Sequence, residues 1–70
     1  MTHNPWNLSD REAEVLAALV KHGSSKVVAK EFGLSHRTIE HHVSAAKFRM
    51  GVEHRTQAII AWDRYKRGAA

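Results

Sequence analysis

The sequence predicts a small all-α domain of four helices, and three observations predict it. Apolar residues recur at helical spacing in four segments, no segment of useful length alternates as a half-buried strand does, and all four glycines fall where helices should end. The chain has 70 residues, 43% of them apolar, but ten of these are alanines. Such a composition suits thin helices in close contact, and it excludes a doubly wound sheet, a barrel or a two-domain enzyme with a buried pocket.

The first helix is predicted over residues 9–21. Ser9 and Glu12 have the spacing of a capping box, in which the Ser9 hydroxyl accepts from the amide three residues on and the Glu12 carboxylate reaches back to the Ser9 amide. Gly23 can take the left-handed conformation that ends a helix. Apolar residues follow helical spacing in this segment: Leu8, Val15, Leu16, Leu19 and Val20.

A second helix is predicted over residues 25–32, capped by Ser24 or Ser25, and its end has the spacing of a helix-turn-helix. Two short helices joined by a three-residue turn must cross at a steep angle. The residues around the turn fit this crossing, with a small residue at the contact, a glycine for the positive φ and apolar residues to pack the corner: Ala29, Gly33, Leu34 and Ile39. A simple αα corner of a small bundle is the alternative.

The last two helices are predicted over residues 36–50 and 55–66. Ser35 can cap the first of them, which has one narrow apolar stripe at i, i+4, i+7 and i+11, formed by Ile39, Val43, Ala46 and Met50. The other has an apolar face formed by Ala58, Ile59, Ala61, Trp62 and Tyr65. We expect residues 1–7 to form an arm in which Trp6 is a candidate anchor, residues 8–67 to form the domain, and residues 68–70 to form a tail.

Positive charge is concentrated in the second half of the chain. The net charge is +4 at pH 7, residues 1–31 are neutral overall, and residues 32–70 carry the whole excess. This distribution points toward a polyanion such as nucleic acid as the binding partner. The alternative is a basic soluble domain whose charge only keeps it away from zero net charge. The chain has no cysteine and no membrane-length apolar run, and its first residues lack the apolar stretch of a signal peptide, so we expect a cytoplasmic protein with no membrane partner.

Several motifs together resemble the LuxR-type (GerE-like) helix-turn-helix domain, and the quorum-sensing branch in particular. They agree in order and spacing over residues 8–66: Leu8 to Leu16 (LSDREAEVL), Ser24-Ser25-Lys26, Val28-Ala29, Leu34-Ser35, Arg37-Thr38-Ile39, His42-Val43, Arg49-Met50-Gly51-Val52 and Arg55-Thr56-Gln57-Ala58. The resemblance implies a four-helix DNA-binding unit whose third helix enters the major groove and whose fourth commonly forms the dimer contact. Glu40 and Phe48 depart from the family, which is often basic at the first position and usually polar at the second.

The geometry of the helix over 36–50 also predicts a DNA-contacting side. At about 100° per residue, the side opposite the apolar stripe carries Arg37, Thr38, His41, Ser44, Ala45 and Phe48. A helix in the groove reads bases with its N-terminal turns. We therefore expect base contacts from Arg37, Glu40, His41 and Ser44, since Arg can pair with guanine and Glu can accept from cytosine. A solvated helix surface is the alternative.

Phosphate contacts are expected from two sources. Ser35 and Thr38 lie near the positive end of the helix dipole, where anions bind, and Lys47 lies on a flank of the same helix. By the resemblance, Lys26 on the second helix is a further phosphate contact. We also expect a homodimer, because one thin helix on a thin core should not bury all four large or apolar side chains of the last helix. The expected interface is formed by Ala58, Ile59, Trp62 and Tyr65.

Catalysis, metal binding and cofactors are not expected. His36, His41 and His42 lie close in sequence, but their spacings of five and one do not match the i, i+4 ligand spacing of a helical zinc site. No credible pair of nucleophile and base is present on so small a scaffold. The leading hypothesis is a sequence-specific regulator that binds double-stranded DNA as a homodimer, with RNA polymerase or another regulator as a further candidate partner. The alternative is a protein-interaction module that keeps the fold and sequesters another regulator, which Glu40 and Phe48 favour; an RNA-binding module is a weaker one.

Overall fold

Four helices follow one another along residues 4–68, the part of the chain that the computed structural model describes. They are α1 (Asp10–His22), α2 (Ser25–Phe32), α3 (His36–Met50) and α4 (Arg55–Gly68). The predicted all-α class is confirmed, and α2 and α3 have the predicted bounds. The first helix begins one residue later than predicted, because Ser9 is an extended cap outside it, and it ends one residue later, at His22, directly before the left-handed Gly23. The fourth helix includes Gly68, which we had expected beyond its end, and Ala69 and Ala70 lie outside the described residues.

The helix ends follow the local chemistry of the sequence. The capping box of α1 is present: the Ser9 hydroxyl accepts from the Glu12 amide at 3.1 Å, and the Ser9 amide donates to the Glu12 carboxylate at 3.0 Å. The expected serine cap of α2 is only half right. Ser24 holds the N-cap position, but its side chain makes no capping hydrogen bond.

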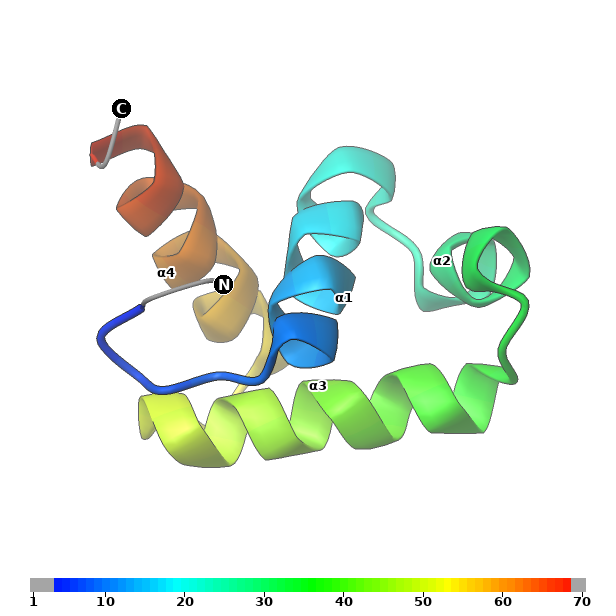
Figure 1. The fold of residues 1–70 in the computed structure, drawn as a ribbon, viewed down its shortest axis with the longest axis horizontal. Coiled ribbons are helices and arrows are strands. Elements are labelled where there is room, and N and C mark those ends of the chain that lie inside the picture. Colours follow the sequence, from blue (N-terminus) through cyan, green and yellow to red (C-terminus); the bar gives the residue numbers. More distant parts are fainter. Residues whose placement is uncertain (1–3, 69–70) are drawn as a thin grey trace.

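α3 lies along one side of the molecule, and α1, α2 and α4 stand on it (Figure 1). α1 and α3 each contact all three other helices, and α1 stands between α2 and α4 (Figure 1). The apolar residues fall into two clusters, one under α1 and α4 and one under α1 and α2. α3 supplies Ala46 to the first cluster and Ile39 and Val43 to the second, which is the predicted apolar stripe. This arrangement leaves the opposite side of α3 uncovered along the whole helix.

The turn between α2 and α3 is closed by backbone hydrogen bonds. The Leu34 amide donates to the Ala29 carbonyl at 2.9 Å, and Gly33 has a φ of 68°. A side chain on Gly33 would meet nothing within 4 Å, so the positive φ, not space, is what requires glycine there. The turn sets α3 against α2 as the helix-turn-helix spacing predicted.

The segment before α1 packs onto the domain. The Asn4 side-chain oxygen accepts from the amides of Trp6 and Leu8, at 3.2 and 2.8 Å. Trp6 then lies against α4, with its ring centroid 6.4 Å from that of Trp62 and 5.5 Å from that of Tyr65. Trp6 is therefore the anchor that the sequence suggested. Residues 1–3 of the expected arm lie outside the described residues.

Candidate nucleic-acid interface

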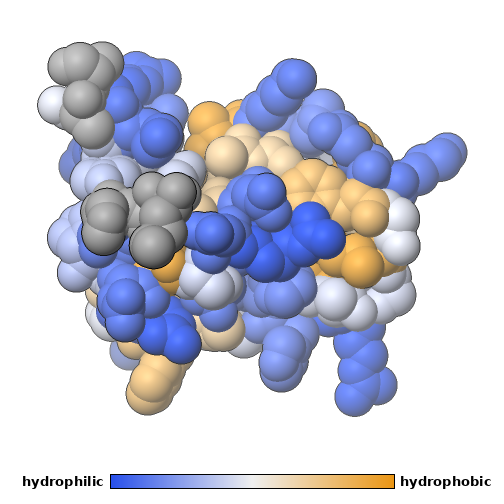
Figure 2. Space-filling view, in the orientation of Figure 1, coloured by the Kyte–Doolittle hydropathy of each residue, from blue (hydrophilic) through white to orange (hydrophobic). Residues whose placement is uncertain are grey.

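The outward side of α3 repeats the spacing of its buried side. The buried stripe is at i, i+4, i+7 and i+11 from Ile39, and the same spacing from Arg37 gives a set of exposed residues: Arg37, His41, Ser44 and Phe48. Among residues 4–68, Arg37 and Ser44 make no side-chain hydrogen bond or ion pair, and the His41 ring lies beside the ring of the neighbouring His42, with 6.5 Å between their centroids. Figure 2 shows hydrophilic side chains projecting along the lower edge, where α3 lies, with an apolar group among them. Three of the four expected base-contact residues therefore share one accessible face.

The N-terminus of α3 is organised by the two hydroxyl residues that we expected near phosphate. The Ser35 oxygen accepts from the Thr38 amide at 3.0 Å, and the two hydroxyl oxygens lie 2.9 Å apart. Both side chains are therefore held at the start of the helix, where the dipole favours negative charge. Lys26 is exposed on the neighbouring α2 and has no ion pair within the described range.

Glu40, the fourth expected base contact, lies on a flank of the exposed face, and its carboxylate is bound by another side chain of the same chain. Nη1 of Arg55, at the start of α4, donates to both Glu40 carboxylate oxygens, at 3.0 and 2.8 Å. Nε2 of His36 lies 3.6 Å from the same carboxylate. Glu40 lies on the flank of α3 that faces α4, and both of its carboxylate oxygens accept from Arg55. The base contact expected from Glu40 stays a prediction, in which the carboxylate would have to accept from cytosine with its remaining lone pairs.

Two residues that the sequence analysis missed complete this contact, which we call the Glu40–Arg55–Ser25 cluster. Nη2 of Arg55 donates to the hydroxyl of Ser25, which is buried at the start of α2. The Ser25 hydroxyl, and then the Arg55 guanidinium and His36, hold the pKa of the Glu40 carboxyl below its ordinary value, while partial burial opposes this effect. The sequence held one signal of this internal contact: position 40 is acidic, whereas the family that the chain resembles is often basic there.

Two further basic residues flank the exposed face of α3. Nζ of Lys47 donates to the Glu53 carbonyl at 3.4 Å, on the side of α4. Arg49 lies on the other flank, where its guanidinium is 3.3 Å from both the Glu12 carboxylate and the Asn7 carbonyl. The stems of both side chains are thus directed away from the centre of the face, and their positive charges lie along its two edges.

The expected dimer residues divide into two groups. Ala58 is fully buried and Trp62 is 3% exposed, both in the core cluster with Leu16 and Ala46. Trp6 and α1 cover these two side chains within the chain, so that two of the four expected interface residues are buried and two are not. Ile59 and Tyr65 are half-buried against the core, and Ile60, which we did not predict, is 46% exposed on α4.

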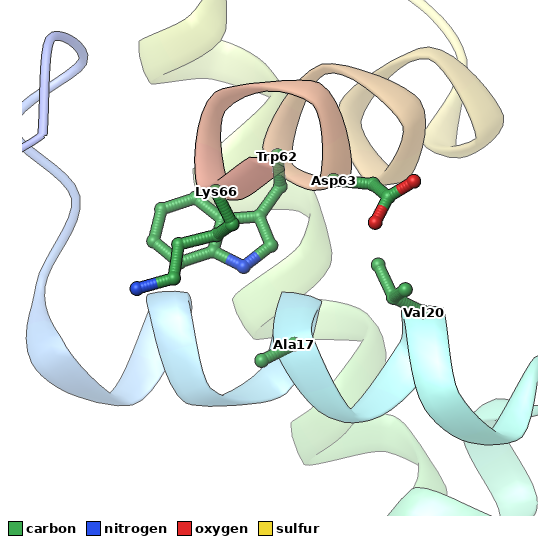
Figure 3. Close-up of a pocket in the computed structure, with 5 residues that line it drawn as sticks. All are labelled: Ala17, Val20, Trp62, Asp63 and Lys66. Carbon is green, nitrogen blue, oxygen red and sulfur yellow. The ribbon is translucent and has the colours of Figure 1, made fainter. Parts of the chain in front are cut away.

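A shallow groove of about 220 Å³ runs between α1 and α4 (Figure 3). Its floor is apolar, with Ala17 and Val20 from α1 below Trp62 from α4, and Asp63 and Lys66 lie at its rim. Nζ of Lys66 is 5.8 Å from the centre of the Trp62 ring, a cation–π contact that covers part of the indole. The groove lies away from the exposed face of α3, so the two surfaces can act separately.

α2 and α3 form a helix pair that crosses steeply and is joined by a turn with a glycine. α3, the second helix of the pair, presents exposed polar side chains between basic flanks. These features together define the class of helix-turn-helix DNA-binding domains. The comparison with protein families agrees: the profile of the bacterial regulatory proteins of the luxR family matches residues 6–62. The chain belongs to this family, which is one of DNA-binding transcription regulators and not of enzymes.

The chain is also similar to the spore germination protein GerE of Bacillus subtilis (strain 168). The two are 38% identical over 53 residues, which are 76% of this chain and 72% of GerE. No solved structure gives a significant match. Within residues 4–68, none of the helices combines the length and the apolar character needed to cross a membrane.

Proposed function

We propose that this protein is a sequence-specific regulator that binds double-stranded DNA in the cytoplasm, with α3 in the major groove. The observation that carries the proposal is the exposed face of α3, where Arg37, His41 and Ser44 share one side of the helix between basic flanks. A major groove admits one α-helix, and its base edges offer acceptors to arginine and to hydroxyl or imidazole donors. The family membership supports the same function.

Each residue has a defined role in this proposal. Arg37, in the first turn of α3, pairs with guanine, and His41 and Ser44 contact the next base edges along the groove. Phosphate oxygens on the two walls of the groove are bound by Lys26, Ser35, Thr38 and Lys47. Lys47 can serve in this way because an ammonium has three donors and the Glu53 carbonyl uses one of them.

We further propose a homodimer through the outer side of α4. Ile60 is the large apolar residue that α4 exposes most, and Ile59 and Tyr65 are half-buried beside the core. Ala58 and Trp62 support this surface from below but are not part of it. A twofold dimer would place two α3 helices about one helical turn of DNA apart. Sedimentation of the wild type and of Ile60→Arg tests this, since the charge should shift the species to a monomer; a wild type that sediments as a monomer with and without DNA would contradict it.

Selection of bound sites from a random duplex pool tests the central proposal. We expect the wild type to enrich a defined site, with binding that weakens steeply as salt rises because phosphate contacts release counterions. Arg37→Ala should lose preference at one base position, with a loss of about 1–3 kcal/mol there. A chain that shows no salt-sensitive binding to any duplex at low ionic strength would contradict the proposal.

A protein-interaction module remains the second candidate function, and one observation favours it: Phe48 is 88% exposed. Glu40 no longer supports this candidate, because Arg55 binds its carboxylate within the chain. The module would use the same fold to sequester another regulator or to contact RNA polymerase. A stoichiometric complex with a purified regulator that excludes DNA would favour it over DNA binding.

A further inference from the structure

Phe48 is the largest exposed apolar side chain among the described residues, with 88% of its surface accessible. We infer that Phe48 recognises the 5-methyl group of a thymine in the DNA site, an inference that rests on the proposed DNA binding by α3. The C5-methyl of thymine is the one apolar group that a base pair presents in the major groove, and phenylalanine is among the residues that contact it.

The position of Phe48 on the helix is the first step of the argument. It follows Arg37, His41 and Ser44 at i+11, i+7 and i+4, so the four side chains lie within about 60° of one another around α3. A helix that turns Arg37 and His41 toward base edges therefore turns Phe48 toward the same groove. Eleven residues of helix span about 16 Å, which is at most roughly five base-pair steps.

The surroundings of Phe48 are the second step. Its sequence neighbours are both cations, and each is drawn to a different flank: Lys47 toward the Glu53 carbonyl and Arg49 toward the Glu12 carboxylate. The aromatic ring is left at the centre of this turn, with positive charge on both sides. The major groove has the complementary pattern, with phosphates along both walls and base edges, including thymine methyls, between them.

This charge pattern distinguishes DNA from an apolar protein surface as the occupant. A protein that buries Phe48 in a dry pocket would also have to desolvate or pair Lys47 and Arg49, which are 100° away on either side. DNA supplies an anionic wall on either side together with an apolar group between them. The Glu40 carboxylate, the acidic group of this helix, is bound by Arg55 and so does not repel the phosphates.

Replacement of single thymines by deoxyuridine tests the inference, because it removes the methyl group and nothing else. In the site selected by the wild type, each thymine is replaced in turn, and binding is measured for the wild type, Phe48→Ala, Phe48→Leu and Val27→Ala. Val27 is a matched control, an exposed apolar residue on α2. We expect one position, within about five base pairs of the guanine read by Arg37, at which deoxyuridine weakens wild-type binding by about 3–10-fold.

Phe48→Ala should weaken binding to the thymine site by a similar factor and abolish the response to deoxyuridine, so that the two changes are not additive. Phe48→Leu should keep part of the response, and Val27→Ala all of it. If the wild type binds its site but Phe48→Ala leaves affinity and the deoxyuridine response unchanged, the inference is overturned while the proposed function stands. If no duplex is bound at all, the proposed function fails and the inference falls with it.

Discussion

Arg55 and Glu40 are joined by two hydrogen bonds, of 3.0 and 2.8 Å, that connect the first turn of α4 to the second turn of α3. The same guanidinium reaches the buried Ser25 hydroxyl of α2. One side chain of α4 therefore contacts two other helices, α2 and α3. Because arginine is planar and has a fixed set of donors, it can hold these elements in one relative orientation, which a lysine could not do.

The first prediction is a measurable coupling between Glu40 and Arg55. We expect a double-mutant cycle of Glu40→Gln and Arg55→Gln to give about 0.5–1 kcal/mol in the free energy of unfolding by urea, because each side chain is 37% exposed and solvent screens the pair. Arg55→Gln alone should cost more than Glu40→Gln, since it also removes the partner of Ser25. The exposed Arg11–Glu14 pair, 3.5 Å apart, is the control, and a coupling no larger than its value would contradict the prediction.

Acid should remove the contribution of Glu40. The pKa of Glu40 in the folded protein lies below its ordinary value of 4.5, first because of the Ser25 hydroxyl and then because of Arg55. Its stabilising contribution is therefore complete above the ordinary pKa and is lost as the pH falls through the folded pKa. The free energy of unfolding of the wild type minus that of Glu40→Gln should therefore shrink as the pH falls below about pH 4. A difference that persists undiminished at pH 3 would exclude this role.

The elements could be predicted from the sequence because their causes are local. The capping box of Ser9 and Glu12 and the positive φ of Gly33 each depend on residues within one turn, and both are as predicted. Glu40 could not be placed in the same way, because its partner Arg55 is 15 residues away and the choice between groove and partner depends on how α4 crosses α3.

The burial of Ala58 and Trp62 within the chain could not be predicted for a similar reason. Periodicity identified Ala58 and Trp62 as apolar but could not say what covers them. Their cover comes from Trp6, 56 residues before Trp62, and from the contact of α1 with α4. Contacts between residues far apart in the chain leave no periodic pattern in the sequence. An apolar helix face therefore has the same pattern whether the chain itself or a second copy of it buries that face.

The third prediction concerns the packing of Trp6. We expect Trp6→Ala to lower the free energy of unfolding by about 2 kcal/mol, because a half-buried indole and its contacts with two aromatic rings are lost. Phe48→Ala is the matched control: it also removes an aromatic ring, but one that is 88% exposed, and should cost less than about 0.5 kcal/mol. Equal losses for the two variants in urea titrations would show that Trp6 does not stabilise the domain.

The last prediction separates phosphate contacts from base contacts. Lys26→Ala and Arg37→Ala should each reduce the slope of log affinity against log salt concentration by about one unit, because each removes a cation from the DNA face. They should differ in sequence dependence: Lys26→Ala should weaken selected and unrelated duplexes equally, whereas Arg37→Ala should weaken the selected site more and relax one base position.

Lys21→Ala is the charge-matched control for this pair. Lys21 lies in the last turn of α1, at the end of that helix remote from α3 (Figure 1). Its loss should leave the salt slope and the selected site unchanged, since screening at about 0.1 M salt acts within about 10 Å. Fluorescence anisotropy over a series of salt concentrations measures all three variants. Equal slopes for Lys21→Ala and Lys26→Ala would show that binding depends on the net charge of the chain and not on the face formed by α2 and α3.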